Sequence, residues 1–194
     1  MTSKPAVLKR ASASQVPVAK PPCTIHPSAV IADKAQITGS YPVEIGENAI
    51  IHPHARIRAE GGKVVIGKST MVYERAVIGG EGTAGGNVVI GDYVCIESGA
   101  LVVAKSMGLG TVVDVNAQVG RGAVVGEWCK VAPLERVEAG EEVEDFTVVF
   151  GDGRKRVDRT VKDHAEVREA RKESQEKAVE VMRRLVPNAA AKWM

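Results

Sequence analysis

The sequence offers few side chains for acid–base or metal chemistry. Its four histidines are the first candidates, because imidazole can act as a general base or bind a metal ion. His26 and His52 occupy matched Ile-His-Pro segments, His54 follows two positions after His52, and His164 stands near the C-terminus. His52 and His54 would share a face if they lay in a strand, because alternate strand residues point the same way. Two imidazoles are fewer than a zinc site needs, and no histidine that could act as a general base occurs between His54 and His164. The sequence therefore predicts no metal site, no cofactor site and no catalytic residue.

Two further segments resemble reactive sites. Glu97 and Ser98 are adjacent, but we interpret them as a solvated corner. The glycine-rich segment 79–87 could cradle a phosphate, yet it lacks the Gly-Lys-Ser/Thr ending and a following helix. We expect it to be an inserted loop.

Composition narrows the class of protein. Only 4% of the residues are aromatic and 44% are hydrophobic, while the net charge is +2. This balance excludes a wholly disordered chain and gives no electrostatic reason to expect nucleic acid or membrane insertion. Three scattered cysteines without a Cys-x-x-Cys pair indicate a reducing compartment.

A six-residue repeat supplies the elements that position these side chains. An α-helix cannot produce an apolar period of six, whereas a short strand followed by a tight corner can. The repeated aliphatic positions are Ile25, Ile31, Ile37, Ile45, Ile51, Ile57, Ile66, Val72, Ile78, Ile90, Ile96, Val102, Met107, Val113, Val119, Val125, Val131, Val137, Val143 and Val149. Four positions after many of them stands a small residue, such as Ala29, Ala55 or Thr111.

Departures from the six-residue spacing show how many strands form one coil. They follow every third hexad, between Ile37 and Ile45, Ile57 and Ile66, Ile78 and Ile90, and Val102 and Met107. The chain therefore returns to the same corner after each third strand. We predict an all-β solenoid over residues 23–151, a parallel β-helix with three strands per coil, six full coils and part of a seventh. Its narrow interior explains the shortage of aromatic residues.

The remaining segments flank this solenoid. We expect a disordered basic tail at 1–22, a linker at 152–162, an α-helix at 163–186 and a tail at 187–194. The helix has a modest apolar stripe that we expect to lie along the prism or against a partner. The stripe consists of Val167, Ala170, Ser174, Ala178, Val181 and Leu185. We predict Val181, Leu185 and an exposed Trp193 as partner-binding residues.

The hexads resemble the hexapeptide-repeat superfamily, which implies a left-handed β-helix. Acyltransferases, gamma-class carbonic anhydrases and non-catalytic scaffold subunits all share this fold, so both homotrimeric enzyme classes stay open as alternatives. The resemblance implies that the gamma-class ligand positions fall at Gly79, Ser98 and Val103, none of which is a strong zinc donor.

The block from Ile50 to Gly67, which begins Ile-Ile-His-Pro-His, and the helix end Leu185-Val186-Pro187-Asn188 resemble the dynactin subunit 6 family. That resemblance implies a non-enzymatic subunit of the pointed-end complex in the cytoplasm, associated with microtubules and dynein. Its implied partners are dynactin subunit 5, the pointed-end actin-related protein, other dynactin subunits and, indirectly, dynein. The family relationship also implies a role in capping the actin-related filament and in dynein-dependent cargo transport.

Overall fold

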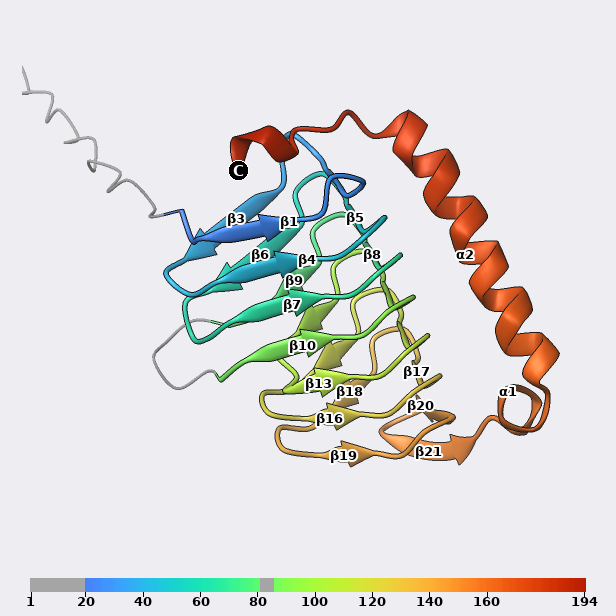
Figure 1. Cartoon of the computed structure of the whole chain (residues 1–194). Helices are drawn as coiled ribbons and strands as arrows, with labels where there is room; N and C mark the ends of the chain where they lie inside the picture. Colours follow the sequence, from blue (N-terminus) through green and yellow to red (C-terminus); the bar gives the residue numbers. More distant parts are fainter. Residues whose placement is uncertain (1–19, 81–85) are drawn as a thin grey trace, which may run out of the picture.

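A computed structural model describes residues 20–80 and 86–194 of the chain. Most of the predicted N-terminal tail and part of the glycine-rich segment lie outside these residues. The described chain forms a three-sided parallel solenoid with one long helix beside it (Figure 1).

Three sheets of short parallel strands form the sides of the solenoid. Sheet 1 contains β1 (Cys23–Ile25), β4 (Val43–Ile45), β7 (Val64–Ile66), β10 (Val88–Ile90), β13 (Ser106–Met107), β16 (Val124–Val125) and β19 (Glu142–Val143). Sheet 2 contains β2 (Val30–Ile31), β5 (Ile50–Ile51), β8 (Met71–Val72), β11 (Cys95–Ile96), β14 (Val112–Val113), β17 (Lys130–Val131), β20 (Thr147–Phe150) and the antiparallel β21 (Arg154–Val157). Sheet 3 contains β3 (Gln36–Gly39), β6 (Arg56–Ala59), β9 (Val77–Ile78), β12 (Leu101–Val102), β15 (Gln118–Val119) and β18 (Arg136–Val137). The predicted six coils and part of a seventh are confirmed.

The pairing register explains why the repeat is so regular. Ile25 pairs with Ile45, and Ile45 pairs with Ile66, so one aliphatic residue of each coil lies above the next. The irregular spacings fall between sheet 3 and sheet 1, at the corner predicted from the sequence. Insertions there leave the stacked strands in register.

The interior consists of stacked aliphatic and small residues. All predicted aliphatic positions are buried except Ile25, which is partly buried, and the small residues of the repeat are buried with them. Val and Ile fill such an interior without voids because their branched side chains have few rotamers and pack closely between coils. No aromatic ring belongs to the buried core of the solenoid; among the described residues Trp193 packs against it from outside.

The C-terminal end of the solenoid differs from the predicted linker. Residues 152–162 contain β21 and all but the last residue of the helix α1 (Arg159–Asp163). The guanidinium groups of Arg154 and Arg156 lie 5.3 and 5.9 Å from the ring centre of Phe150, and Lys155 pairs with Glu141. A last strand so rich in cations discourages further strand pairing at this end.

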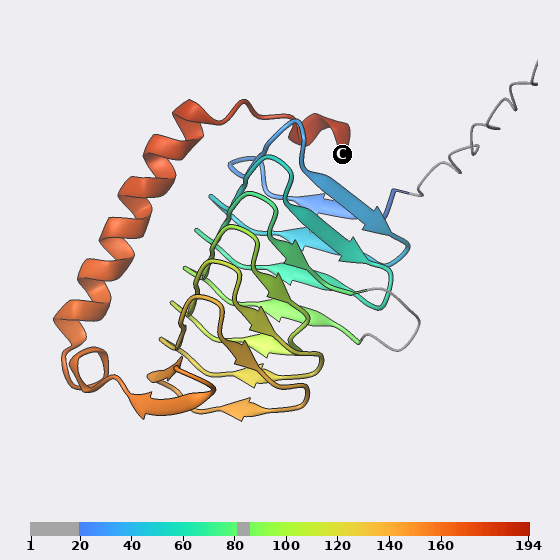
Figure 2. The same cartoon turned by 180° about the vertical axis from the view of Figure 1, so that it is seen from behind.

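The long helix α2 (Ala165–Leu185) begins later than predicted because His164 has an extended backbone that separates it from α1. It ends at Leu185, since Val186 is extended before Pro187. Figure 2 shows α2 running beside the solenoid from the last coil back to the first.

The C-terminal segment covers the first coil and is no free tail. The side-chain oxygen of Asn188 accepts hydrogen bonds from the amides of Ile31 and Ala190, and its amide group donates to Ala29. η1 (Ala190–Lys192) follows, with Ala190 buried in the core. Trp193 is half-buried against that core, which corrects the expectation that it is exposed. Its role in partner binding stays a prediction.

Candidate partner-binding surface

The corner between sheets 1 and 2 carries a row of residues with left-handed backbone conformation. Their φ angles lie between 51° and 67°, and one such residue occurs in each coil from the second to the seventh. The row consists of Asn48, Ser69, Tyr93, Gly110, Trp128 and Phe146. Glycine and asparagine are common in this conformation, but bulky aromatic residues are rare there. Three of the seven aromatic residues therefore project from one strained corner.

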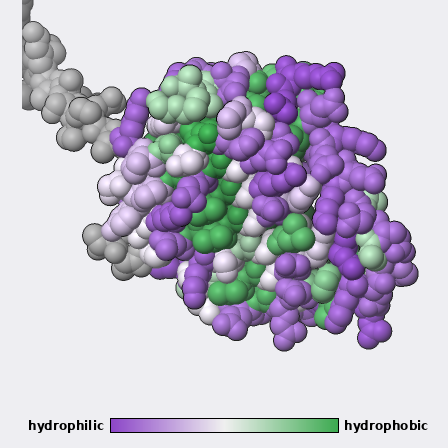
Figure 3. All heavy atoms as spheres, in the orientation of Figure 1, coloured by the Kyte–Doolittle hydropathy of each residue, from purple (hydrophilic) through white to green (hydrophobic). Residues whose placement is uncertain are grey.

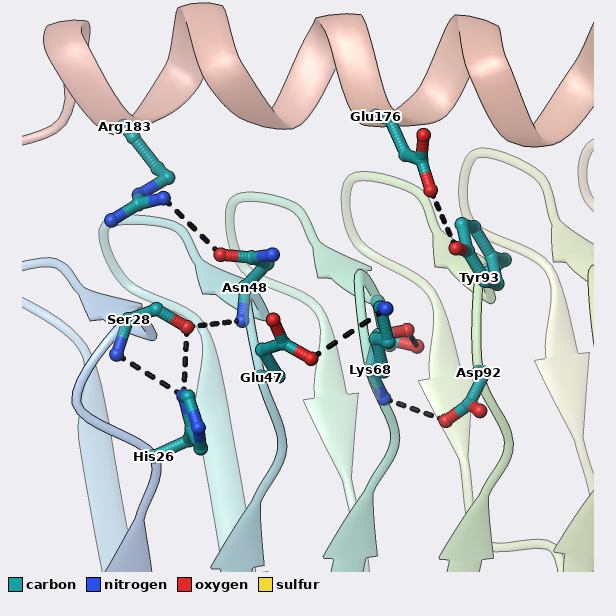
Figure 4. A network of polar contacts seen from close by, with 10 residues as sticks. His26, Ser28, Glu47, Asn48, Lys68, Asp92, Tyr93, Glu176 and Arg183 are labelled. Atoms are coloured by element: carbon teal, nitrogen blue, oxygen red, sulfur yellow. Dashed lines mark hydrogen bonds and ion pairs between the residues drawn. The ribbon is translucent and has the colours of Figure 1, made fainter.

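Helix α2 lies along this corner, with its N-terminal part beside Phe146 of the last coil and its C-terminal part beside Asn48 of the second. Arg183 donates to the Asn48 side chain at 3.2 Å, and Tyr93 donates its hydroxyl proton to Glu176 at 2.6 Å (Figure 4). Gln175 donates to the carbonyl oxygen of Ser69 at 2.8 Å. The hydrogen bond to Glu176 raises the pKa of Tyr93 to about 12.

The other end of α2 uses cation–π contacts. The Lys172 ammonium lies 5.8 Å from the Trp128 ring centre, and the Arg168 guanidinium lies 5.6 Å from that of Phe146. Residues 168 to 183 rise about 22 Å along a helix, and five coil steps advance about 24 Å. Because these lengths match, one helix reaches nearly every coil.

Apolar packing holds the C-terminal half of α2 against sheet 2 of the solenoid. Val179 is buried against Val30, Ile50 and Met71, which point outward from sheet 2, and Met182 packs beside it. Of the predicted stripe, Ala178 packs against this cluster. Val181 and Leu185 are 53% and 67% exposed, so they do not lie against the prism, and their role in partner binding stays a prediction.

Sheet 1 provides a second exposed apolar surface. Val65, Val89 and Val124 point outward from three of its strands, and Val89 is 43% exposed. Figure 3 shows hydrophobic atoms gathered over the middle of this sheet, with hydrophilic atoms around α2. A partner could therefore contact either sheet 1 or the outer side of α2.

The histidines do not form a catalytic group. His52 is buried, stacks on Tyr73 at 4.6 Å between ring centres, and bonds through Nδ1 to Glu74 at 3.0 Å. Ser98 donates to the other oxygen of Glu74 at 3.3 Å. Burial raises the pKa of Glu74, but hydrogen bonds from its own backbone, His52 and Ser98 lower it on balance. Neither His52 nor His54 lies in a strand, and His54 is exposed in a left-handed turn, so the condition under which the two would share a face is not met.

The remaining candidates for chemistry are scattered. Gly79 and Val103 follow strands of sheet 3, whereas Ser98 lies at the corner between sheets 2 and 3. Glu97 accepts a hydrogen bond from Cys95 and is not paired with Ser98. Among residues 20–80 and 86–194, no group of three or more His, Cys, Asp or Glu is placed to hold a metal ion. In the same part of the chain no helix is long and apolar enough to cross a membrane.

Comparison with known proteins shows the family. No family model matches the chain. Dynactin subunit 6 of Xenopus tropicalis is 31% identical over 136 residues, which cover 66% of this chain and 67% of that protein. The chain belongs to the dynactin subunit 6 family.

Relatives outside the dynactin subunit 6 family share the solenoid. Carnitine operon protein CaiE of Escherichia coli K12 is 26% identical over 136 residues, 70% of this chain and 64% of that protein. A crystal structure of a hexapeptide transferase family protein from Anaplasma phagocytophilum superposes with a TM-score of 0.67 at 20% identity, covering 83% of this chain and 91% of that one. The fold of this family member is the left-handed β-helix of the hexapeptide proteins.

Proposed function

We propose that this chain is a non-enzymatic structural subunit of dynactin that works in the pointed-end complex. There it helps to cap the actin-related filament and supports dynein-dependent transport and cargo binding along microtubules in the cytoplasm. The observation that carries the proposal is its relationship to dynactin subunit 6 across two thirds of both chains.

The architecture suits a rigid subunit. Stacked coils have few internal degrees of freedom, and α2 connects the two ends of the solenoid through contacts with five of the six corner residues of that row. Asn188 and β21 cover opposite ends of sheet 2. The sides are therefore better placed than the covered edges of sheet 2 to meet partners.

We propose that dynactin subunit 5 and the pointed-end actin-related protein are among those partners, and that Val181 and Leu185 contribute to the contact. Both are exposed on the side of α2 away from the buried Val179. Two aliphatic residues at i and i+4 form one continuous apolar patch on a helix. Other dynactin subunits, and dynein indirectly, complete the expected assembly.

The test is affinity purification of the tagged full chain from native cytosol, with mass spectrometry of the bound proteins. We expect dynactin subunits to co-purify, and Val181→Glu with Leu185→Glu to reduce their recovery without changing the melting temperature. Lys177→Glu, an exposed change on the same helix, is the control. Recovery of no dynactin component would overturn the proposal.

An enzyme of the hexapeptide class is the second candidate, because CaiE and a hexapeptide transferase family protein share the solenoid. A gamma-class carbonic anhydrase would contain near one zinc or iron per chain, and either enzyme class would form a homotrimer. Elemental analysis measures the metal content of the purified chain, and light scattering measures its oligomeric state. Together they distinguish a structural subunit from an enzyme of the hexapeptide class. A metal-loaded trimer would replace the structural role with an enzymatic one.

A further inference from the structure

A single residue separates the two C-terminal helices. His164 has an extended backbone, with φ −119° and ψ 101°, between the end of α1 and the start of α2. The sequence from 159 to 185 contains neither Gly nor Pro, the two residues that most disfavour a helix interior. The local sequence therefore permits one straight helix over this whole segment, and tertiary contacts must impose the bend.

The Arg168 side chain holds this bend. Its guanidinium donates hydrogen bonds to the carbonyl oxygens of Val161 and Lys162, at 2.5 and 2.8 Å. In an unbroken helix these two carbonyls would accept from the amides four positions later, those of Ala165 and Glu166. Arg168 therefore satisfies the same two carbonyl groups that the bend deprives of their helical partners.

The bend joins a firmly anchored segment to a weakly anchored one. On its C-terminal side, Val179 and Ala190 are buried, and the Asn188 side chain makes three hydrogen bonds. On its N-terminal side, β21 has no buried residue, and Val161 is the one buried residue of α1. Straightening of the helix would therefore move α1 and β21 while α2 stays on the solenoid.

β21 covers the edge of β20, the last parallel strand of sheet 2. The carbonyl oxygen of Val149 accepts a hydrogen bond from the preceding coil at 2.9 Å, so the backbone of Val149 faces that coil. Backbone groups alternate in direction along a strand, so those of Val148 and Phe150 point to β21. Without β21, Val148 and Phe150 would present an open strand edge, which is a template for pairing with another strand.

We propose that the bend at His164 is a hinge, that Arg168 is its latch, and that release of the latch opens the edge of β20. When the guanidinium leaves the two carbonyls, His164 becomes helical and α1 continues into α2. The carbonyls then accept from the amides of Ala165 and Glu166, and β21 is drawn away from β20. In the intact chain the bent form predominates, because it keeps Val161 buried and β21 paired.

Hydrogen exchange of single backbone amides in the full chain distinguishes the two forms. Arg168→Ala removes the latch, and we expect it to speed exchange at Val148 and Phe150 at least tenfold. Arg184→Ala removes an arginine and its ion pair from the same helix, far from the bend, and should change these rates less than twofold. The amide of Val113, on a central strand of sheet 2, reports whether the solenoid of each variant is folded.

A matched pair of substitutions at the hinge separates straightening from fraying of α1. In the Arg168→Ala background, His164→Ala should favour the straight helix about fivefold over His164→Gly, because Ala is the better helix former. Exchange at Val148 should therefore be about fivefold faster with Ala than with Gly. With Ala, the amides of Ala165 and Glu166 should exchange at least twofold more slowly than in the original chain, because straightening gives them carbonyl partners.

Three outcomes would overturn the proposal. Exchange along β20 that stays within twofold of the original chain in Arg168→Ala would show that Arg168 is no latch. Equal rates for the His164→Ala and His164→Gly variants, or faster exchange at residues 165 and 166, would show that α1 frays and does not join α2. The experiment needs no dynactin subunit, so its result is independent of the test of the proposed function.

Discussion

Gly110 lies beneath the ring of Trp128, the corner residue of the next coil. A Cβ atom on Gly110 would stand 2.5 Å from Cε3 of that ring, closer than real contacts allow. The glycine therefore has two roles: it adopts a left-handed φ of 67°, and it makes room for the largest side chain on the corner.

Replacing Gly110 by Ala separates these two roles when Gly122 serves as the control. Gly122 has a similar φ of 72° but open space around its missing Cβ. We expect Gly122→Ala to cost about 1–2 kcal/mol of unfolding free energy from backbone strain. Gly110→Ala should cost roughly 1–3 kcal/mol more from overpacking against Trp128. If urea unfolding gave the same loss of unfolding free energy for Gly110→Ala and Gly122→Ala, the Trp128 ring would move aside at no cost.

The same substitution at two nearby positions of α2 tests which side faces the solenoid. Val179 is 4% exposed and Val181 is 53% exposed. Val179→Ala should lower the unfolding free energy by roughly 1.5–3 kcal/mol, whereas Val181→Ala should stay within about 0.5 kcal/mol of the original chain. Thermal and urea melts measure both. If Val181→Ala lowered the unfolding free energy more than Val179→Ala did, the helix would have to be rotated about its axis.

Asn188 should stabilise the first coil through its three side-chain hydrogen bonds to Ala29, Ile31 and Ala190. Asn188→Ala leaves these backbone groups without that partner and should cost roughly 1–3 kcal/mol. Asn188→Asp keeps the accepting oxygen and should cost less. Hydrogen exchange at the Ile31 amide reports the effect locally, and unchanged protection in Asn188→Ala would contradict this role.

The cysteines should differ in their reactivity toward iodoacetamide at pH 8. Burial raises the pKa of all three thiols, that of Cys129 to about 11 and that of Cys95 further. A raised thiol pKa lowers the reactive thiolate fraction at any pH below it. Cys23, which is more accessible than Cys129, should therefore be alkylated first, as mass spectrometry can follow. Urea should make the three rates similar, and fast labelling of Cys129 in the folded chain would contradict its burial.

Much of the solenoid could be predicted because its order is local in the sequence. Each hexad places one aliphatic residue inward and turns the chain, so Ile51, Ile57 and their equivalents specify the coil without reference to distant residues. The irregular spacings after Ile37 and Ile57 mark the third corner for the same reason. The shortage of aromatic residues follows from the narrow interior.

The candidate surface depends on contacts between residues far apart in the chain. Sequence periodicity favoured the stripe through Val181 and Leu185, but α2 uses Lys172, Gln175 and Val179. Much of that stripe is polar, and its partners are backbone carbonyls and aromatic rings about 40 to 110 positions away. The apolar pattern of the helix by itself therefore does not predict these contacts.

The sequence by itself therefore determined the repeat, the number of coils and the presence of a C-terminal helix, because each depends on neighbours within a few residues. Only the tertiary structure decided that Asn188 covers the first coil, that β21 closes the last one, and that the Trp128 ring lies over Gly110. These features arise where separate segments meet, and the free energy of such contacts depends on both surfaces at once.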